Sequence, residues 1–203
     1  MRLRTAIVPV AALALAGSAT PALAHEADAH KTVRSALAAL DAEGEGVGMT
    51  HVANLPFQTM SPNAAPNGSD IEFAKIGGRE YAFAGTLRQG LQIADITDPT
   101  NPVLAAHYAC PVYQGDVQVF DQGARVLAAY TADSRLSGSA GWEQSTCVTE
   151  ARELGFEVTG DHLGTFLVDI TNPLEPTTVS FLPEKAGSHN MTVHPSGQFL
   201  YNS

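Results

Sequence analysis

The sequence predicts an all-β protein built from four-stranded antiparallel sheets that repeat along the chain. From Ile71 onward, apolar residues occur in short runs of strand length, separated by Gly, Asp-Pro and Asn-Pro turn signals. One such run and its turn recur: Asp95 returns as Asp169, 74 positions later. The 203 residues are 44% hydrophobic and 16% charged, a composition typical of a packed protein and not of a disordered or fibrous one.

The chain begins with the three regions of a secretory signal peptide. Arg2 and Arg4 precede an apolar run over residues 7–16, and Ala22-Leu23-Ala24 forms a small-residue cleavage site. The alternative is an N-terminal membrane anchor, but the run is shorter than the roughly 20 residues that span a bilayer. We therefore expect residues 1–24 to be a signal peptide cleaved near Ala24. The signal looks bacterial, and we expect the mature protein to be secreted or on the cell surface, without a stable membrane span.

Residues 25–69 are interpreted as an N-terminal arm and linker. Apolar residues at helical spacing between 25 and 40 indicate a short helix or a loose arm. A Gly/Glu linker follows, and residues 61–69 are rich in Pro, Asn and Gly, as is typical of a loop. The repeated part is then expected to occupy residues 70–203.

The repeat extends over nearly forty positions. GLQIADITDP at residues 90–99 recurs as GTFLVDITNP at residues 164–173. Val119 matches Val193, and Gly123 matches Gly197, at the same spacing and without a gap. Convergent turn chemistry would explain the Asp-Pro and Asn-Pro pairs, but it would not explain the shared spacing downstream of them.

Each copy is expected to hold four short strands. They are residues 91–96, 103–108, 116–120 and 125–130 in the first copy, and 166–170, 177–182, 190–194 and 198–201 in the second. Pro lacks the N–H that a strand ladder needs, so Pro99 and Pro173 end the first strand of each copy. Tight turns are expected at Gln122-Gly123 and Ser196-Gly197. Four strands per repeat is the blade of a β-propeller, so the predicted fold is a partial β-propeller after a short N-terminal arm.

The period locates an inserted loop. Propeller repeats usually run roughly 40–50 residues, so the longer spacing here indicates an insertion at about residues 131–163. Cys147 lies in that stretch, and Cys110 lies before it. An even number of cysteines in an oxidising compartment predicts one disulfide, which would pin the insertion to the preceding blade. The alternative is two buried free thiols.

The segments LQIADITDPTNP, residues 91–102, and FLVDITNPLEP, residues 166–176, resemble the LVIVD repeat of secreted bacterial propeller-like proteins. The resemblance covers about residues 70–203. It implies the propeller fold and carries no catalytic motif with it. The first copy departs slightly from the pattern, with Ala94 where the second has Val168, and the cysteine-bearing insertion is outside the pattern.

Two copies and a partial third are too few to close a ring, which takes four to eight blades. We therefore expect the chain to be the N-terminal part of a longer protein, whose remaining blades are its partners. The alternative is a short form that pairs with another chain through its open strand edges.

Candidate site residues lie where a blade begins. His189 and Asn190 occupy the positions of Gly115 and Asp116 one copy earlier. In a propeller, such residues from successive blades can face the central axis, so His189, Asp116 and Asn190 are candidate ligands of a divalent metal, the one cofactor suggested. The alternative is that these polar groups are satisfied locally within their loops.

The composition and motifs favour binding over catalysis. The net charge of −10 argues against a nucleic-acid binder. The sequence lacks a G-x-S-x-G, an H-E-x-x-H and a phosphate-binding loop. We expect an exported binding or scaffold module for an unidentified protein, glycan or small ligand. The alternative function is a metal-dependent extracytoplasmic enzyme with an axial loop site.

Overall fold

The structure is a computed structural model that describes residues 50–60, 67–184 and 188–203. The described part of Val52–Ser203 belongs to one compact unit. The predicted signal peptide, residues 1–24, and the predicted arm up to residue 49 lie outside the described residues.

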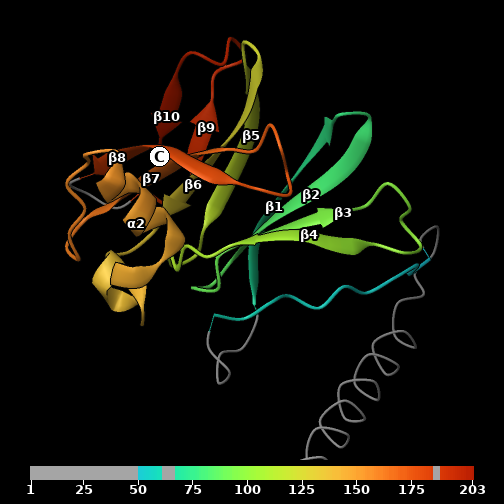
Figure 1. Cartoon of the computed structure of the whole chain (residues 1–203), viewed down its shortest axis with the longest axis horizontal. Coiled ribbons are helices and arrows are strands. Elements are labelled where there is room, and N and C mark those ends of the chain that lie inside the picture. Colours follow the sequence, from blue (N-terminus) through green and yellow to red (C-terminus); the bar gives the residue numbers. More distant parts are fainter. Residues whose placement is uncertain (1–49, 61–66, 185–187) are drawn as a thin grey trace, which may run out of the picture. The chain divides into compact units, whose positions relative to one another are not determined.

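In the part of the chain that the structure describes, three antiparallel sheets follow one another (Figure 1). The first sheet contains β1 (Gly68–Ile76), β2 (Arg79–Thr86), β3 (Leu91–Asp95) and β4 (Val103–Tyr108) in that order. The second contains β5 (Asp116–Gln122), β6 (Arg125–Ala132), β7 (Leu163–Asp169) and β8 (Thr177–Glu184). β9 (Met191–Val193) and β10 (Leu200–Asn202) form a hairpin. The predicted four-stranded antiparallel sheets are thereby confirmed; none of the sheets in the described residues closes on itself.

The sequence repeat and the sheets are out of phase by two strands. The sequence copy runs from β3 to β6, whereas β3 and β4 complete the first sheet and β5 and β6 begin the second. Residues 109–115 cross from one sheet to the other instead of forming a turn within a sheet. The first sheet therefore begins with β1 and β2, to which the sequence analysis assigned no strands.

The predicted repeat is visible in a set of hydrogen bonds that we call the strand-end latch. Asp95 Oδ1 accepts the N–H of Thr97 at 3.0 Å, just beyond the end of β3. The Thr97 hydroxyl accepts the N–H of Glu80, in the neighbouring strand β2, at 3.1 Å. The same two contacts, at 2.9 and 3.0 Å, recur in the second copy among Asp169, Thr171 and Val126.

An arginine at the start of the neighbouring strand adds to each latch. Arg79 forms a salt bridge with Asp95, and the Arg125 Nε lies 3.7 Å from the Asp169 carboxylate. The hydrogen bonds from Thr97, with Arg79, hold the pKa of Asp95 below its usual value. Where each repeated strand ends, an aspartate carboxylate and a threonine hydroxyl therefore accept hydrogen bonds from backbone N–H groups.

A glycine begins the repeated strand in both copies for a steric reason. Gly90 and Gly164 have φ angles of +81° and +148°, which L residues with a side chain rarely adopt. A Cβ on Gly90 would lie 2.4 Å from the carbonyl oxygen of Tyr108, and one on Gly164 would lie 2.2 Å from that of Leu182. The outer strand of each sheet approaches so closely here that only glycine fits.

The core lies between the first and second sheets and includes the inserted segment. Its fully buried side chains include Phe83, Leu91, Ile93, Tyr108, Val117, Tyr130, Phe166 and Val168. Side chains alternate between the two faces of a strand, so Ala82 and Ala84, which flank Phe83, point away from this core. The first sheet therefore has an outward face.

The insertion between β6 and β7 is held by the predicted disulfide. It contains two short 3-10 helices, η1 (Leu136–Gly138) and η2 (Trp142–Gln144), and the helix α2 (Thr146–Glu153). Cys147 in α2 is bonded to Cys110 in the crossing segment, which confirms that prediction. The helix packs against β8, where Glu150 Oε2 accepts the N–H of Thr178 at 2.7 Å.

The hairpin of β9 and β10 has a different turn from the hairpin of β5 and β6, its equivalent in the preceding copy of the repeat. β5 and β6 close with Gln122 paired to Arg125, so two residues form the turn. In the β9–β10 hairpin the N–H of His194 donates to Phe199, and residues 195–198 form a wider turn. Pro195 occupies the sequence position of Asp121, and it has no N–H to continue the ladder. The tight turn expected at Ser196-Gly197 is thus displaced, although Gly197 keeps its positive φ.

We predict that Gly164→Ala lowers the free energy of unfolding by about 1–3 kcal/mol, because the added Cβ meets a backbone carbonyl that cannot move without disturbing β8. Urea denaturation followed by circular dichroism measures it. Gly138→Ala is the matched control, since its Cβ would meet nothing closer than Arg88 Nη2 at 3.5 Å. Equal urea midpoints for the two variants would contradict the steric explanation.

Candidate functional site

The predicted metal candidates come together in a small polar pocket of about 60 Å³. Asp116, His189 and Asn190 all line it. The remaining lining residues, Ser69, Asp70 and Gln114, come from the starts of β1 and β5. Each of the three sheets thus contributes residues from the beginning of its first strand or just before it.

Hydrogen bonds occupy both oxygens of the Asp116 carboxylate. Oδ2 accepts the N–H of Met191 at 2.8 Å, and Oδ1 accepts the Nδ2 of Asn190 at 3.1 Å. Asp70 repeats the first contact one sheet earlier, since its Oδ2 accepts the N–H of Val117 at 3.0 Å. We call these two contacts the sheet-to-sheet bridges. Each carboxylate joins the first strand of its own sheet to the first strand of the next.

His189 lines the polar pocket but directs one ring nitrogen to a different carboxylate. Its Nδ1 lies 3.2 Å from Asp133 Oδ2, and its side chain is exposed. Over residues 50–60, 67–184 and 188–203, no three or more His, Cys, Asp or Glu side chains are grouped so that they could hold a metal ion. The proposed set of His189, Asp116 and Asn190 contains an amide and only two such side chains, so the metal site stays a prediction.

Burial raises the pKa of Asp116 above its ordinary value of 3.8. The hydrogen bond from the Met191 N–H opposes this shift, and the nearby Asp70 carboxylate adds to it. Glu72 behaves similarly, because burial and then Asp70 raise the pKa of its carboxyl group. The polar pocket is therefore a place where negative charge is partly desolvated.

An apolar groove of about 310 Å³ lies on the outward face of the first sheet. Its second wall is formed by residues 52–60, which we call the strap (Figure 1, cyan). In the strap, Ala53, Leu55 and Phe57 are half-buried and the residues between them are exposed. This alternation is that of an extended strand with one face against the protein.

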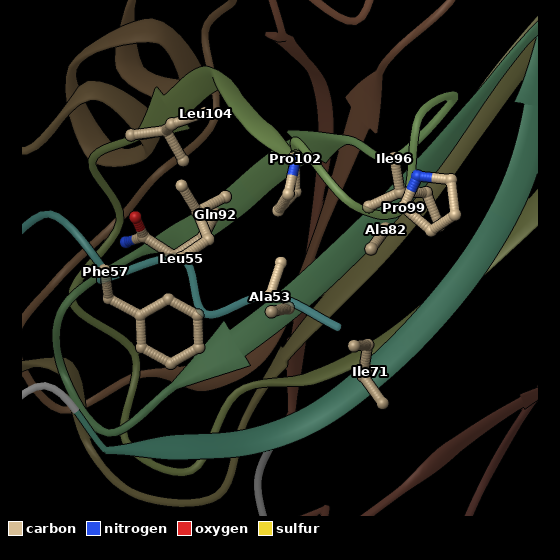
Figure 2. A pocket seen from close by; sticks show the side chains of 12 residues that line it. Ala53, Leu55, Phe57, Ile71, Ala82, Gln92, Ile96, Pro99, Pro102 and Leu104 are labelled. Atoms are coloured by element: carbon tan, nitrogen blue, oxygen red, sulfur yellow. The ribbon is translucent and has the colours of Figure 1, made fainter. Parts of the chain in front are cut away.

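Figure 2 shows the side chains of the groove converging from the strap and from the sheet. The sheet contributes residues from all four of its strands and from the turn that follows β3, and all but one of them are small or apolar. They are Ile71, Ala82, Ala84, Gln92, Ala94, Ile96, Pro99, Pro102 and Leu104. Gln92 is the one polar side chain among the lining residues, and Ile71 at the edge of the groove is 52% exposed.

Two buried glutamines hold the strap in place. Gln92 Oε1 accepts the N–H of Gln58 at 3.0 Å, and its Nε2 donates to the Gln58 carbonyl at 3.3 Å. Gln89 Oε1 accepts the N–H of Met60 at 2.8 Å. The side-chain amides thus form the hydrogen bonds that the backbone of a neighbouring strand would otherwise form. They contact the strap at Gln58 and Met60, whereas Ala53, Leu55 and Phe57 line the groove.

Sequence analysis found Asp116, Asn190 and His189 but not Asp70 or the strap. Asp70 lies 46 positions before Asp116, a spacing free of the insertion, and Arg79 and Arg125 share it. A search at that shorter period would have found Asp70. The strap carried a weaker signal, the alternation of Ala53, Leu55 and Phe57.

The chain matches no protein-family model and no curated protein. Within the described residues, the structure contains no helix of the length and apolar character needed to cross a membrane.

We predict that Asp116→Asn changes how the free energy of unfolding varies with pH in the acid range. The folded-state pKa of Asp116 lies above its unfolded value, so its contribution to stability is complete below the unfolded pKa. That contribution is lost as the pH rises through the folded pKa. The wild type's advantage over the variant in free energy of unfolding should therefore shrink from about pH 3 to pH 7, as measured by urea denaturation. A difference that grows with pH would show the opposite shift.

Proposed function

We propose that this chain is an exported, propeller-type binding module of the LVIVD kind, and that the groove between strap and first sheet is its binding site. The repeated four-stranded sheets and the strand-end latches support the propeller assignment. The Cys110–Cys147 disulfide is compatible with an oxidising compartment outside the cytoplasm.

The sheet-to-sheet bridges also support a propeller. Asp70 and Asp116 connect the first strands of successive sheets by the same contact, which suits a fan of blades around one axis. The remaining blades, belonging to a longer protein, are the partners that this proposal includes.

The single observation that carries the binding function is the chemistry of the groove. The recurring aspartates of the repeat are engaged with backbone N–H groups, which leaves them little freedom for acid–base work. The groove instead offers a concave, apolar lining of the size that ligand sites have. An apolar group of a ligand would be removed from water there, at about 25 cal/mol per Å² of buried apolar area.

We predict that the full chain binds the uncharged fluorescent probe N-phenyl-1-naphthylamine, and that Ala94→Phe reduces the affinity at least tenfold. Ala94 lines the groove, so a phenyl ring there occupies the space that the probe needs. Titration of probe fluorescence against protein measures the affinity.

Ala124→Phe is the matched control, because it makes the same change at an exposed turn between β5 and β6. It should bind the probe as the wild type does. If Ala94→Phe has the circular dichroism spectrum of the wild type and binds the probe equally well, the groove is not the binding site.

The second candidate function is a metal-dependent extracytoplasmic enzyme. The observation that favours it is the meeting of Asp116, His189 and Asn190 in one polar pocket. On this alternative, elemental analysis of the purified full chain finds stoichiometric copper or calcium, and His189→Ala loses it. Metal-free protein with wild-type circular dichroism would leave the binding module as the function.

A further inference from the structure

We infer that the free edge of β10 is the docking site of an extended segment with the sequence pattern that β3 and β7 share. That pattern is a glycine, a mostly apolar strand, and Asp-Ile-Thr followed by Asp-Pro or Asn-Pro. We place this segment in a further blade, so the docking site rests on the propeller part of the proposed function. It is independent of the groove, which lies on the first sheet.

Alternate backbone groups of β10 point away from β9. Just beyond the paired residues, the N–H of Ser203 donates to the carbonyl of Asn190 at 3.0 Å, and the N–H of Asn190 donates back at 3.3 Å. The hydrogen-bonding side of an antiparallel strand alternates from residue to residue, so Leu200 and Asn202 direct their N–H and C=O groups to the opposite edge. Among the described residues, this sheet has two strands, and no third strand receives those groups.

The repeat shows what covers the equivalent edge in the other two sheets. Leu200 lies 74 positions after Val126 of β6, which lies 46 positions after Glu80 of β2. The N–H of Glu80 donates to the Thr97 hydroxyl at 3.1 Å, and that of Val126 donates to the Thr171 hydroxyl at 3.0 Å. The isoleucine before each threonine donates its N–H to the carbonyl of the same partner, at 2.8 and 2.9 Å. In both sheets, a strand of one pattern therefore fills the edge that is free in β10.

The exposure of Tyr201 is an independent observation on the same edge. Tyr201 occupies the repeat position of Tyr81 in β2 and of Leu127 in β6, which are 5% and 2% exposed. Tyr81 is paired with Asp95 of β3, and Leu127 is paired with Asp169 of β7. Tyr201 is 57% exposed. A position that is buried in both four-stranded sheets is thus open in the hairpin, as expected where the neighbouring strand is missing.

The hairpin gains stability from an added strand, because β9 and β10 have three residues each and a two-stranded hairpin is marginally stable in water. Backbone hydrogen bonds would hold any extended segment at such an edge, and side chains decide which segment is preferred. Here the preference comes from the threonine hydroxyl that receives the Leu200 N–H. Phe199 stands where the other sheets have Arg79 and Arg125, so the salt bridge of the strand-end latch is not repeated at this edge.

The test uses a synthetic peptide with the sequence of residues 163–173, LGTFLVDITNP, extended by three lysines for solubility and labelled with fluorescein. Fluorescence anisotropy measures its binding to the full chain. We expect saturable binding to one site. A peptide of the same composition in scrambled order should not bind, and equal affinity for both peptides would overturn the docking site.

Two peptide variants test the threonine. The Thr171→Val peptide keeps the shape of the side chain but lacks the hydroxyl for the Leu200 N–H, so it should bind about threefold to tenfold more weakly. The Asn172→Asp peptide is the matched control, because the first copy has Asp98 at that position and the pattern accepts either residue. Equal affinities of the two variants would contradict a strand that docks as β3 and β7 do.

Hydrogen exchange of single backbone amides, followed by NMR, fixes the location on the folded chain. The peptide should slow the exchange of Leu200 and Asn202, whose N–H groups face the free edge. It should leave Tyr201 unchanged, because its N–H faces β9, and Val126 unchanged, because its N–H is already bonded. Protection that does not alternate along β10, or that appears only at the strap, would overturn the docking site.

The results separate the docking site from the groove. Binding of the peptide without binding of N-phenyl-1-naphthylamine would keep the docking site and overturn the groove. Binding of the probe without the peptide would do the reverse, and failure of both would overturn both. A dimer seen by light scattering, and abolished by Leu200→Pro through loss of the edge N–H, would assign the edge to a second copy and overturn the further blade as its occupant.

Discussion

The arrangement of the sheets depends on short polar side chains that accept hydrogen bonds from backbone N–H groups where strands begin and end. An unsatisfied buried N–H costs about 1–3 kcal/mol. Asp116 removes this cost between one sheet and the next, where it accepts the buried N–H of Met191. Asp95 and Thr97 accept exposed N–H groups at the end of β3 and fix the position of that strand end. The recurrence of an acidic residue along the chain thus has a structural explanation, and the groove can form because the sheet beneath it is fixed.

Those parts of the fold that depend on local chemistry could be predicted from the sequence. The Asp-Ile-Thr run followed by Asp-Pro or Asn-Pro specifies a strand and its end within a few residues. The structure places β3 and β7 there, with the same irregularity of register after Ile93 and after Leu167. The disulfide was predictable because two cysteines allow only one pair, and the expected oxidising compartment favours a bond between them. The partial propeller stays a prediction.

The remaining features depend on contacts between distant residues. Which four strands share a sheet is decided by whether residues 109–115 fold back or cross over, and turn residues do not encode that difference. The strap is held by the side chains of Gln89 and Gln92, about 30 positions away, so its local sequence carries only a weak alternation of apolar residues. The polar pocket could be predicted from the sequence in part, because Asp116 and Asn190 occupy equivalent positions of the repeat. The groove could not, because it forms only where the strap packs against the first sheet.

The helix in the insertion has a consequence for self-association. β8 is the outer strand of its sheet, and an outer strand normally presents free N–H groups that invite edge-to-edge aggregation. Glu150 accepts the N–H of Thr178, and the Cys110–Cys147 bond keeps α2 attached to the neighbouring segment. The insertion therefore covers part of this edge, and it leaves the N–H of Thr178 unavailable for pairing with a strand of another chain.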